Sequence, residues 1–147
     1  MKRYIFLIAV TLVSAVACNT TGAPTEFVNA CNPDNEKETL EVSGVLDMRG
    51  SVFCSNTGGR MECGFDLKEA AGSDKKFSAE IAQGSGANSV TEIPKGFKKE
   101  DIKVRDNAGN QIALGTDKVK VTGKMSIAPG AGNSPGVCFM TVYKIDR

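Results

Sequence analysis

Apolar and polar residues alternate in short runs along most of the chain, from residue 39 onward. The run TLEVSGVL (39–46) places Leu40 and Val42 on one face, and DKVKVTGKM (117–125) alternates in the same way. This period of two is typical of a half-buried β-strand. The last run, VCFMTVYKI (137–145), is apolar on both faces, which predicts a central or closing strand. No window predicts a helix of substantial length, so the sequence predicts an all-β protein, a sandwich or a barrel.

Turn residues separate these runs and predict hairpins. MECGFDL (61–67) and KKFSAEIA (75–82) flank a loop with a glycine, and DIKVRD (101–106) and QIAL (111–114) flank the turn sequence NAGN. Gly44 interrupts the first alternating run, which predicts a β-bulge or a sharp bend at that position. A short helical turn is also expected in GFKKED, just before the second predicted hairpin.

The order of these segments resembles the OB-fold, a five-stranded Greek-key barrel. In that family the fourth strand often reads Gly-Asp-x-Val-x-Val-x-Gly. Thr116 is an extra residue here, and the remaining positions are filled by Gly115, Asp117, Val119, Val121 and Gly123. The resemblance covers about residues 39–146 and implies a small closed sheet. Two hairpins compete for the place of the second and third strands, and an eight-stranded lipocalin-like barrel or another small β-barrel is the alternative fold.

The N-terminus has the order of a secretory signal peptide. Lys2 and Arg3 precede the uncharged run 4–17, which ends in small residues. The run is shorter than the roughly 20 apolar residues of a transmembrane helix. We therefore expect residues 1–17 to be a cleaved signal peptide.

Cys18 follows Ala15-Val16-Ala17, and this tetrad resembles a bacterial lipobox, although the family prefers Leu at the position of Ala15. Ordinary signal peptidase is an alternative that would cut the same bond. The resemblance implies a diacylglyceryl thioether on Cys18, which fastens the chain to a membrane. Because Asn19 follows rather than Asp, the expected location is the bacterial cell envelope, with the outer membrane favoured.

Cysteine parity supports lipidation. The chain has five cysteines, and a lipid on Cys18 leaves four, an even number for an exported protein. Cys54 and Cys63 flank a loop between two strand segments and can face each other, which leaves Cys31 with Cys138. This connectivity is favoured among three possible ones, and the other two stay open. A redox pair is disfavoured because there is no C-x-x-C sequence.

These assignments divide the chain into the signal peptide, a lipidated N-terminus and tether (18–38), and the barrel domain (39–147). Removal of the signal peptide leaves about 130 residues, a single-domain length. Cys31 is expected to hold the second part of the tether against the domain.

Composition argues against several function classes. The chain carries 18 basic and 17 acidic side chains, so it lacks the basic excess of most nucleic-acid-binding proteins. It has no histidine, the commonest acid–base catalyst, and no S-x-x-K tetrad-like context in which a lysine would act as the base for a serine nucleophile. The carboxylates along the first half are interpreted as a solvated face rather than a glycosidase pair; they are Glu36, Glu38, Glu41, Asp47, Glu62 and Asp66. The sequence predicts a non-enzymatic protein without a cofactor.

No metal site is predicted either. Zinc generally takes cysteine and histidine ligands, and the cysteines are assigned to disulfides. DNAGN (106–110) offers oxygen ligands but does not have the length of an EF-hand loop, so a turn stabilised by Asp and Asn is favoured over a calcium site.

One basic and aromatic cluster is a candidate ligand site. PKGFKKED (94–101) contains Phe97 among three lysines, a combination that suits an anionic ligand or lipid headgroups; the lysines are Lys95, Lys98 and Lys99. Arg60 in a glycine-rich loop is a further candidate. The alternative is a solvated loop in which Phe97 is a buried anchor. Three phenylalanines at strand positions are expected to fill the core: Phe65, Phe77 and Phe139.

The leading functional hypothesis is a non-enzymatic, lipid-anchored envelope protein whose barrel loops bind a protein partner, a glycan or an anionic small molecule. A surface-displayed lipoprotein that meets host molecules is one alternative. An exported nucleic-acid-binding OB module is the other. The sequence does not identify the ligand or the oligomeric state.

Overall fold

The computed structural model describes residues 20–132 and 135–147. Seven strands and three short 3₁₀ helices make up the described part of the chain, which contains no α-helix. The strands are β1 (Ala23–Thr25), β2 (Thr39–Asp47), β3 (Phe53–Thr57), β4 (Arg60–Lys68), β5 (Lys76–Ala82), β6 (Lys118–Ala128) and β7 (Val137–Asp146). The 3₁₀ helices are η1 (Phe27–Asn29), η2 (Pro33–Asn35) and η3 (Lys99–Asp101). The predicted all-β class is confirmed.

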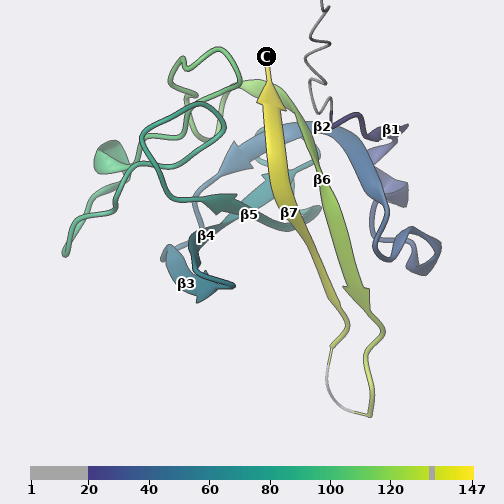
Figure 1. The fold of residues 1–147 in the computed structure, drawn as a ribbon. Helices are drawn as coiled ribbons and strands as arrows, with labels where there is room; N and C mark the ends of the chain where they lie inside the picture. The colour runs from purple at the N-terminus through teal and green to yellow at the C-terminus, as the bar shows by residue number, and fades with distance from the viewer. Residues whose placement is uncertain (1–19, 133–134) are drawn as a thin grey trace, which may run out of the picture.

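All seven strands belong to one sheet, in the order β1-β2-β6-β7-β5-β4-β3 (Figure 1). β2 also pairs with β4, from Val45 opposite Lys68 to Asp47 opposite Asp66, and this contact bends five of the strands into a ring. β5 and β7 are parallel, as are β1 and β2, whereas the other pairs are antiparallel. The sheet has seven strands where five were predicted: five strands form the ring, and β1 and β3 are attached to it through β2 and β4.

The competition between the two predicted hairpins is resolved in favour of the first. β4 and β5 pair continuously, from Glu62 opposite Ala82 to Lys68 opposite Lys76. The second predicted hairpin forms only isolated bridges, one of them between Arg105 and Gln111, so it is a turn within the long connection 83–117. The predicted helical turn in this connection is present as η3.

Of the two alternatives predicted at Gly44, a bulge or a sharp bend, the bulge is absent. The pairing of Gly44 with β6 runs through without a shift, opposite Val119. A Cβ atom on Gly44 would lie 2.5 Å from the carbonyl oxygen of Lys68, so glycine permits the close approach of β4 that closes the ring. The irregularity lies instead between β6 and β7, where Tyr143 is an extra residue in β7.

The inner face of the ring forms the hydrophobic core. Alternate residues of each strand point inward, and the bulge lets β7 place both Val142 and Ile145 there. Phe65 is fully buried and Phe77 almost so, as predicted. Phe139 is only half-buried, because its neighbour Met140 takes the inward position and Phe139 therefore points to the outer face.

The segment predicted to be a tether is folded against the domain for most of its length. β1 pairs with β2, from Ala23 opposite Leu40 to Thr25 opposite Val42, and Ala30 has no exposed surface. The domain therefore begins near residue 23 rather than at residue 39. Cys18 and the predicted signal peptide lie outside the described residues.

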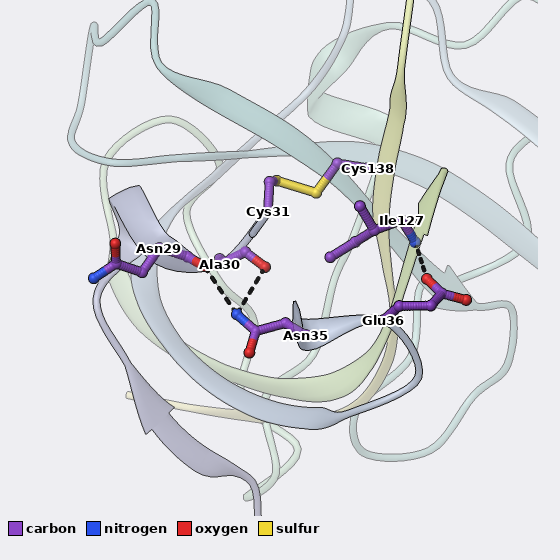
Figure 2. Close-up of a disulfide and its surroundings, with 7 residues drawn as sticks. All are labelled: Asn29, Ala30, Cys31, Asn35, Glu36, Ile127 and Cys138. Atoms are coloured by element: carbon purple, nitrogen blue, oxygen red, sulfur yellow. Dashed lines mark hydrogen bonds between the residues drawn. A yellow bond between two sulfur atoms is a disulfide. The ribbon is translucent and has the colours of Figure 1, made fainter. Parts of the chain in front are cut away.

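Hydrogen bonds fix the second half of this segment to the β6–β7 hairpin (Figure 2). The side-chain amide nitrogen of Asn35 donates to the backbone carbonyls of Asn29 and Ala30, which closes the turn around η2. The Glu36 carboxylate accepts a hydrogen bond from the backbone N–H of Ile127 in β6. These contacts hold residues 29–36 beside the end of the barrel-like ring.

Two disulfides cross-link the domain in the connectivity that the sequence favoured. Cys54 and Cys63 are directly opposite each other on β3 and β4 and are 9 residues apart. Cys31 and Cys138 are 107 residues apart and join the N-terminal segment to β7 (Figure 2). No helix in the described ranges is long and apolar enough to cross a membrane.

Candidate functional site: a charged groove on the outer face

A groove of about 480 Å³ lies on the outer face of the ring, across β4, β5 and β7. Its floor comes from alternate residues of β4 and β5 whose neighbours fill the core. One wall is Arg49, from the loop after β2, and the other is the start of β7. The side chains that give the groove its chemistry are Arg49, Asp66, Lys76, Ser78, Glu80 and Phe139.

Asp66 organises one half of this groove. Its side chain is only 6% exposed, and its two oxygens accept hydrogen bonds from Arg49 Nε at 2.9 Å and Lys76 Nζ at 2.8 Å. The side chains of Arg49 and Lys76 remain 40% and 50% exposed. The Arg49 guanidinium extends over Gly64, within 4.0 Å of the position that a Cβ would occupy. A buried carboxylate therefore holds two partly exposed cations in fixed positions.

Glu80 carries the other half. It is half-buried, and burial raises the pKa of its carboxyl group. The neighbouring Glu62 carboxylate raises this pKa further, while Arg49 opposes the shift. No hydrogen bond or ion pair reaches Glu80 from the residues that the structure describes. Its oxygens are thus acceptors that remain available at the groove.

Two of the acidic side chains do not belong to a solvated face, contrary to the prediction. Asp66 is 4% exposed and Glu62 is 9% exposed. Asp66 is covered by its partners Arg49 and Lys76, and Glu62 pairs with Arg60 at 3.5 Å. Arg49 and Lys76 lie 17 and 10 residues from Asp66 in the sequence. The alternation of residues within one strand cannot predict ion pairs with partners that come from other segments.

Apolar side chains border the groove. Val137 is 51% exposed and, with Phe139, forms the wall contributed by β7. Phe53 is 74% exposed and lies on the same outer face, opposite Gly64 in the β3–β4 pairing. The groove is therefore a row of ionic groups with an apolar wall on its β7 side.

The N-terminal segment supports the groove from behind. Phe77 and Cys138 both line it. The ring of Phe27 packs 5.2 Å from the ring of Phe77, and Cys31 forms the disulfide with Cys138 shown in Figure 2. The shape of the groove consequently depends on residues that the sequence assigned to a tether.

The predicted ligand residues do not form one site. Arg60 begins β4 and pairs with Glu62, on the hairpin next to β3. Lys95 and Lys98 are exposed on the connection 83–117, and the backbone N–H of Lys98 donates to the carboxylate of Asp101 to cap η3. Within the described ranges no hydrogen bond or ion pair joins Arg60 to this segment.

Phe97 and Lys99 attach the long connection to the ring. Phe97 is half-buried and packs against the core, as the buried-anchor alternative predicted. Lys99 Nζ lies 3.2 Å from the carboxylate of Asp47, which also binds Lys68 Nζ at 2.8 Å. Burial alone would raise the pKa of Asp47, but the hydrogen bonds from Lys68, the Met48 N–H and Lys99 outweigh it and lower the pKa. Lys99 thus has a structural partner.

Asp106 locks the far end of the same connection. Its side chain accepts hydrogen bonds from the N–H groups of Ala108 and Asn110 and from Arg147, so the predicted Asp-stabilised turn is confirmed. Burial would raise the pKa of Asp106, and these hydrogen bonds together lower it. In the described part of the chain, no group of three or more acidic or cysteine side chains is placed to hold a metal ion.

Sequence reasoning missed the groove residues Arg49, Lys76, Glu80 and Phe139. The spacing of Lys76, Ser78 and Glu80 at alternate positions of a strand was a usable signal for a polar outer face. For Arg49, which reaches the groove from a loop, no signal was present. No family model matches the chain, and comparisons with curated proteins and with solved structures also give no match.

Proposed function

We propose that this chain is a non-enzymatic, lipid-anchored protein of the bacterial cell envelope that binds a ligand in the groove on β4, β5 and β7. The observation that carries the proposal is the ion-paired row Arg49–Asp66–Lys76 beside Glu80, which has no hydrogen-bond or ion-pair partner among the residues that the structure describes. Side chains that are already held in place lose little conformational entropy when they bind, and rigid strands position them better than loops do.

The two disulfides support a location outside the cytosol, because such bonds persist mainly in oxidising compartments. They also use four of the five cysteines and leave Cys18 over. An odd cysteine next to a lipobox-like sequence is the expected acceptor of a diacylglyceryl group, and two or more acyl chains give stable anchoring.

We further propose that the five-strand ring is an OB barrel. In chain order its strands are β2, β4, β5, β6 and β7, and the groove lies on the second and third of these. It is bordered by Arg49 in the loop after the first strand and by Gly136 in the loop before the fifth. OB-folds bind their ligands on the face of the second and third strands, between these two loops.

The charges in the groove favour this reading over the nucleic-acid-binding alternative. A groove for single-stranded nucleic acid combines a basic track with aromatic stacking platforms. Here Asp66 and Glu80 balance Arg49 and Lys76, so phosphates would meet carboxylates. A larger hollow of about 600 Å³, on the connection 83–117, is lined by mixed charges on exposed loop residues and offers no comparable fixed network.

Cell fractionation and intact-mass analysis test the proposal. The purified mature protein should carry the mass of acyl chains on Cys18 and have no free thiol. The Cys18→Ser variant should leave the membrane fraction, while a Cys54→Ser/Cys63→Ser variant should stay in it. An unacylated mature N-terminus beginning at another residue would refute the anchor. Protease treatment of intact cells then separates a surface-displayed protein, which is cut, from one that faces the periplasm.

A further inference from the structure

The balance of charges in the groove indicates which class of ligand the groove binds. This inference rests on the proposed binding function. Arg49 and Lys76 contribute two positive charges, and Asp66 and Glu80 contribute two negative charges. An anionic ligand near the cations would also meet Glu80, and a cationic ligand near Glu80 would also meet Arg49. Neither sign of charge gains a net Coulombic attraction, and each would lose hydration on entering.

Unused hydrogen-bonding groups of both kinds face the same space. Arg49 gives only its Nε to Asp66, so its terminal nitrogens have no hydrogen-bond partner among the described residues. Lys76 gives one of its three donors to Asp66. Glu80 supplies two acceptor oxygens without a partner in the described ranges. Donors and acceptors therefore stand close together, where β4 and β5 bring Gly64 opposite Glu80.

A hydroxyl group suits this arrangement because it donates one hydrogen bond and accepts others. Adjacent hydroxyls on one ring can donate to Glu80 and accept from Arg49 or Lys76 at the same time. Phe139 adds an apolar surface on the opposite wall, which suits the C–H face of a sugar ring. A volume of about 480 Å³ lies within the range of ligand pockets.

We propose that the groove binds a neutral, polyhydroxylated ligand, an uncharged glycan chain. Glu80 accepts hydrogen bonds from its hydroxyls, Arg49 and Lys76 donate to its oxygens, and Phe139 contacts a ring face. Asp66 acts as a positioning residue that holds the two cations.

The test is titration of the folded, disulfide-bonded protein, followed by amide NMR shifts. The probes are an array of uncharged oligosaccharides that includes chitotetraose and maltotetraose, together with spermidine and a deca-thymidylate strand. At least one uncharged oligosaccharide should shift the amides of β5 and the start of β7. Its affinity should change by less than about twofold between about 0.05 and 0.5 M salt, because no net charge is neutralised.

Matched variants locate the binding. Phe139→Ala and Glu80→Gln should each weaken binding about tenfold, the loss expected for an aromatic contact or a hydrogen bond to a charged group. Tyr143→Ala, on the same strand but outside the groove, and Glu92→Gln, on the long connection, should leave the affinity unchanged. Melting curves confirm that each variant is folded.

The outcomes separate the ligand class from the general function. If spermidine or the thymidylate strand shifts the groove amides and no uncharged oligosaccharide does, the glycan inference is wrong while a binding role for the groove stands. If no oligosaccharide of the array binds, or if binding survives both groove variants, the inference is overturned. Neither result changes the expected behaviour of Cys18→Ser in fractionation, which tests the anchor alone.

Discussion

The two disulfides have very different loop lengths, and this difference predicts how much each contributes to stability. Removing a cross-link restores the loop-closure entropy of the unfolded chain. For a separation of 107 residues this amounts to about 4.8 kcal/mol at room temperature, and for 9 residues to about 2.6 kcal/mol. The free energy of unfolding should therefore fall by about 2 kcal/mol more in Cys31→Ala/Cys138→Ala than in Cys54→Ala/Cys63→Ala.

Equilibrium unfolding in urea, followed by far-UV circular dichroism because the chain has no tryptophan, measures both values. A small domain has only about 5–15 kcal/mol of net stability. The free energy of unfolding of the variant without the long bridge can therefore be measured only if the stability of the unmodified protein lies in the upper part of this range. Where it is unfolded without urea, its folded fraction in a stabilising osmolyte such as sucrose supplies the comparison.

Equal losses in the two variants would refute the loop-entropy reasoning. A larger loss for Cys54→Ala/Cys63→Ala would also contradict it. Cys63 is fully buried, whereas the other three disulfide-bonded cysteines are half-buried, so that result would mean that packing around Cys63 outweighs the constraint on the unfolded chain.

Three further predictions concern single residues. Gly44→Ala should lower the free energy of unfolding by about 1–3 kcal/mol, because the added Cβ would collide with the Lys68 carbonyl. The control Gly50→Ala, in open space, should change the free energy of unfolding by less than about 0.5 kcal/mol. Equal effects of the two substitutions in calorimetry would exclude a special role for Gly44. Glu80→Gln should stabilise the protein at neutral pH. The pKa of Glu80 is raised in the folded state, so the folded protein loses stability as pH rises from the ordinary pKa of 4.5 through the raised value and the carboxyl group ionises. The gain should vanish in melting curves recorded below pH 4.5, where the carboxyl group is protonated in both states. Asp106→Asn should destabilise the protein at neutral pH. The lowered pKa of Asp106 stabilises the fold above the ordinary value of 3.8, and this contribution is lost as pH falls. A difference in melting temperature between the variant and the unmodified protein that does not shrink in acid would contradict this prediction.

Much of the fold was predictable because alternation reports which strand face is buried. The β4–β5 hairpin and the disulfide partners follow from local patterns, since Cys54 and Cys63 flank one short loop. Phe139 was wrongly predicted to lie in the core because β7 is apolar on both faces. The sequence of such a strand does not show which set of alternate residues faces the core. The bulge, one of the two alternatives predicted at Gly44, is absent. Glycine is needed there for the close approach of Lys68, on a strand that pairs with β2 only when the ring closes, and a local pattern does not report this contact.

The groove was less predictable than the fold, because long-range contacts create it. Asp66 is buried and ion-paired with Arg49 and Lys76, and both of these partners come from other segments. The residues 23–38 have the polar composition of a linker, yet β1 pairs with β2 and a disulfide holds Cys31. Composition reports only the mean polarity of the segment, whereas one disulfide and three residue pairs between β1 and β2 are enough to order it.

Because β1 begins early in the chain, only a short segment lies between the proposed lipid anchor and the folded domain. Only five peptide steps separate Cys18 from Ala23, and a fully extended chain covers about 3.4 Å per step, or about 17 Å in all. With acyl chains on Cys18, as proposed, the domain would rest against the headgroups rather than reach far from them. A ligand of the groove would then have to lie close to the bilayer surface, or be brought to it.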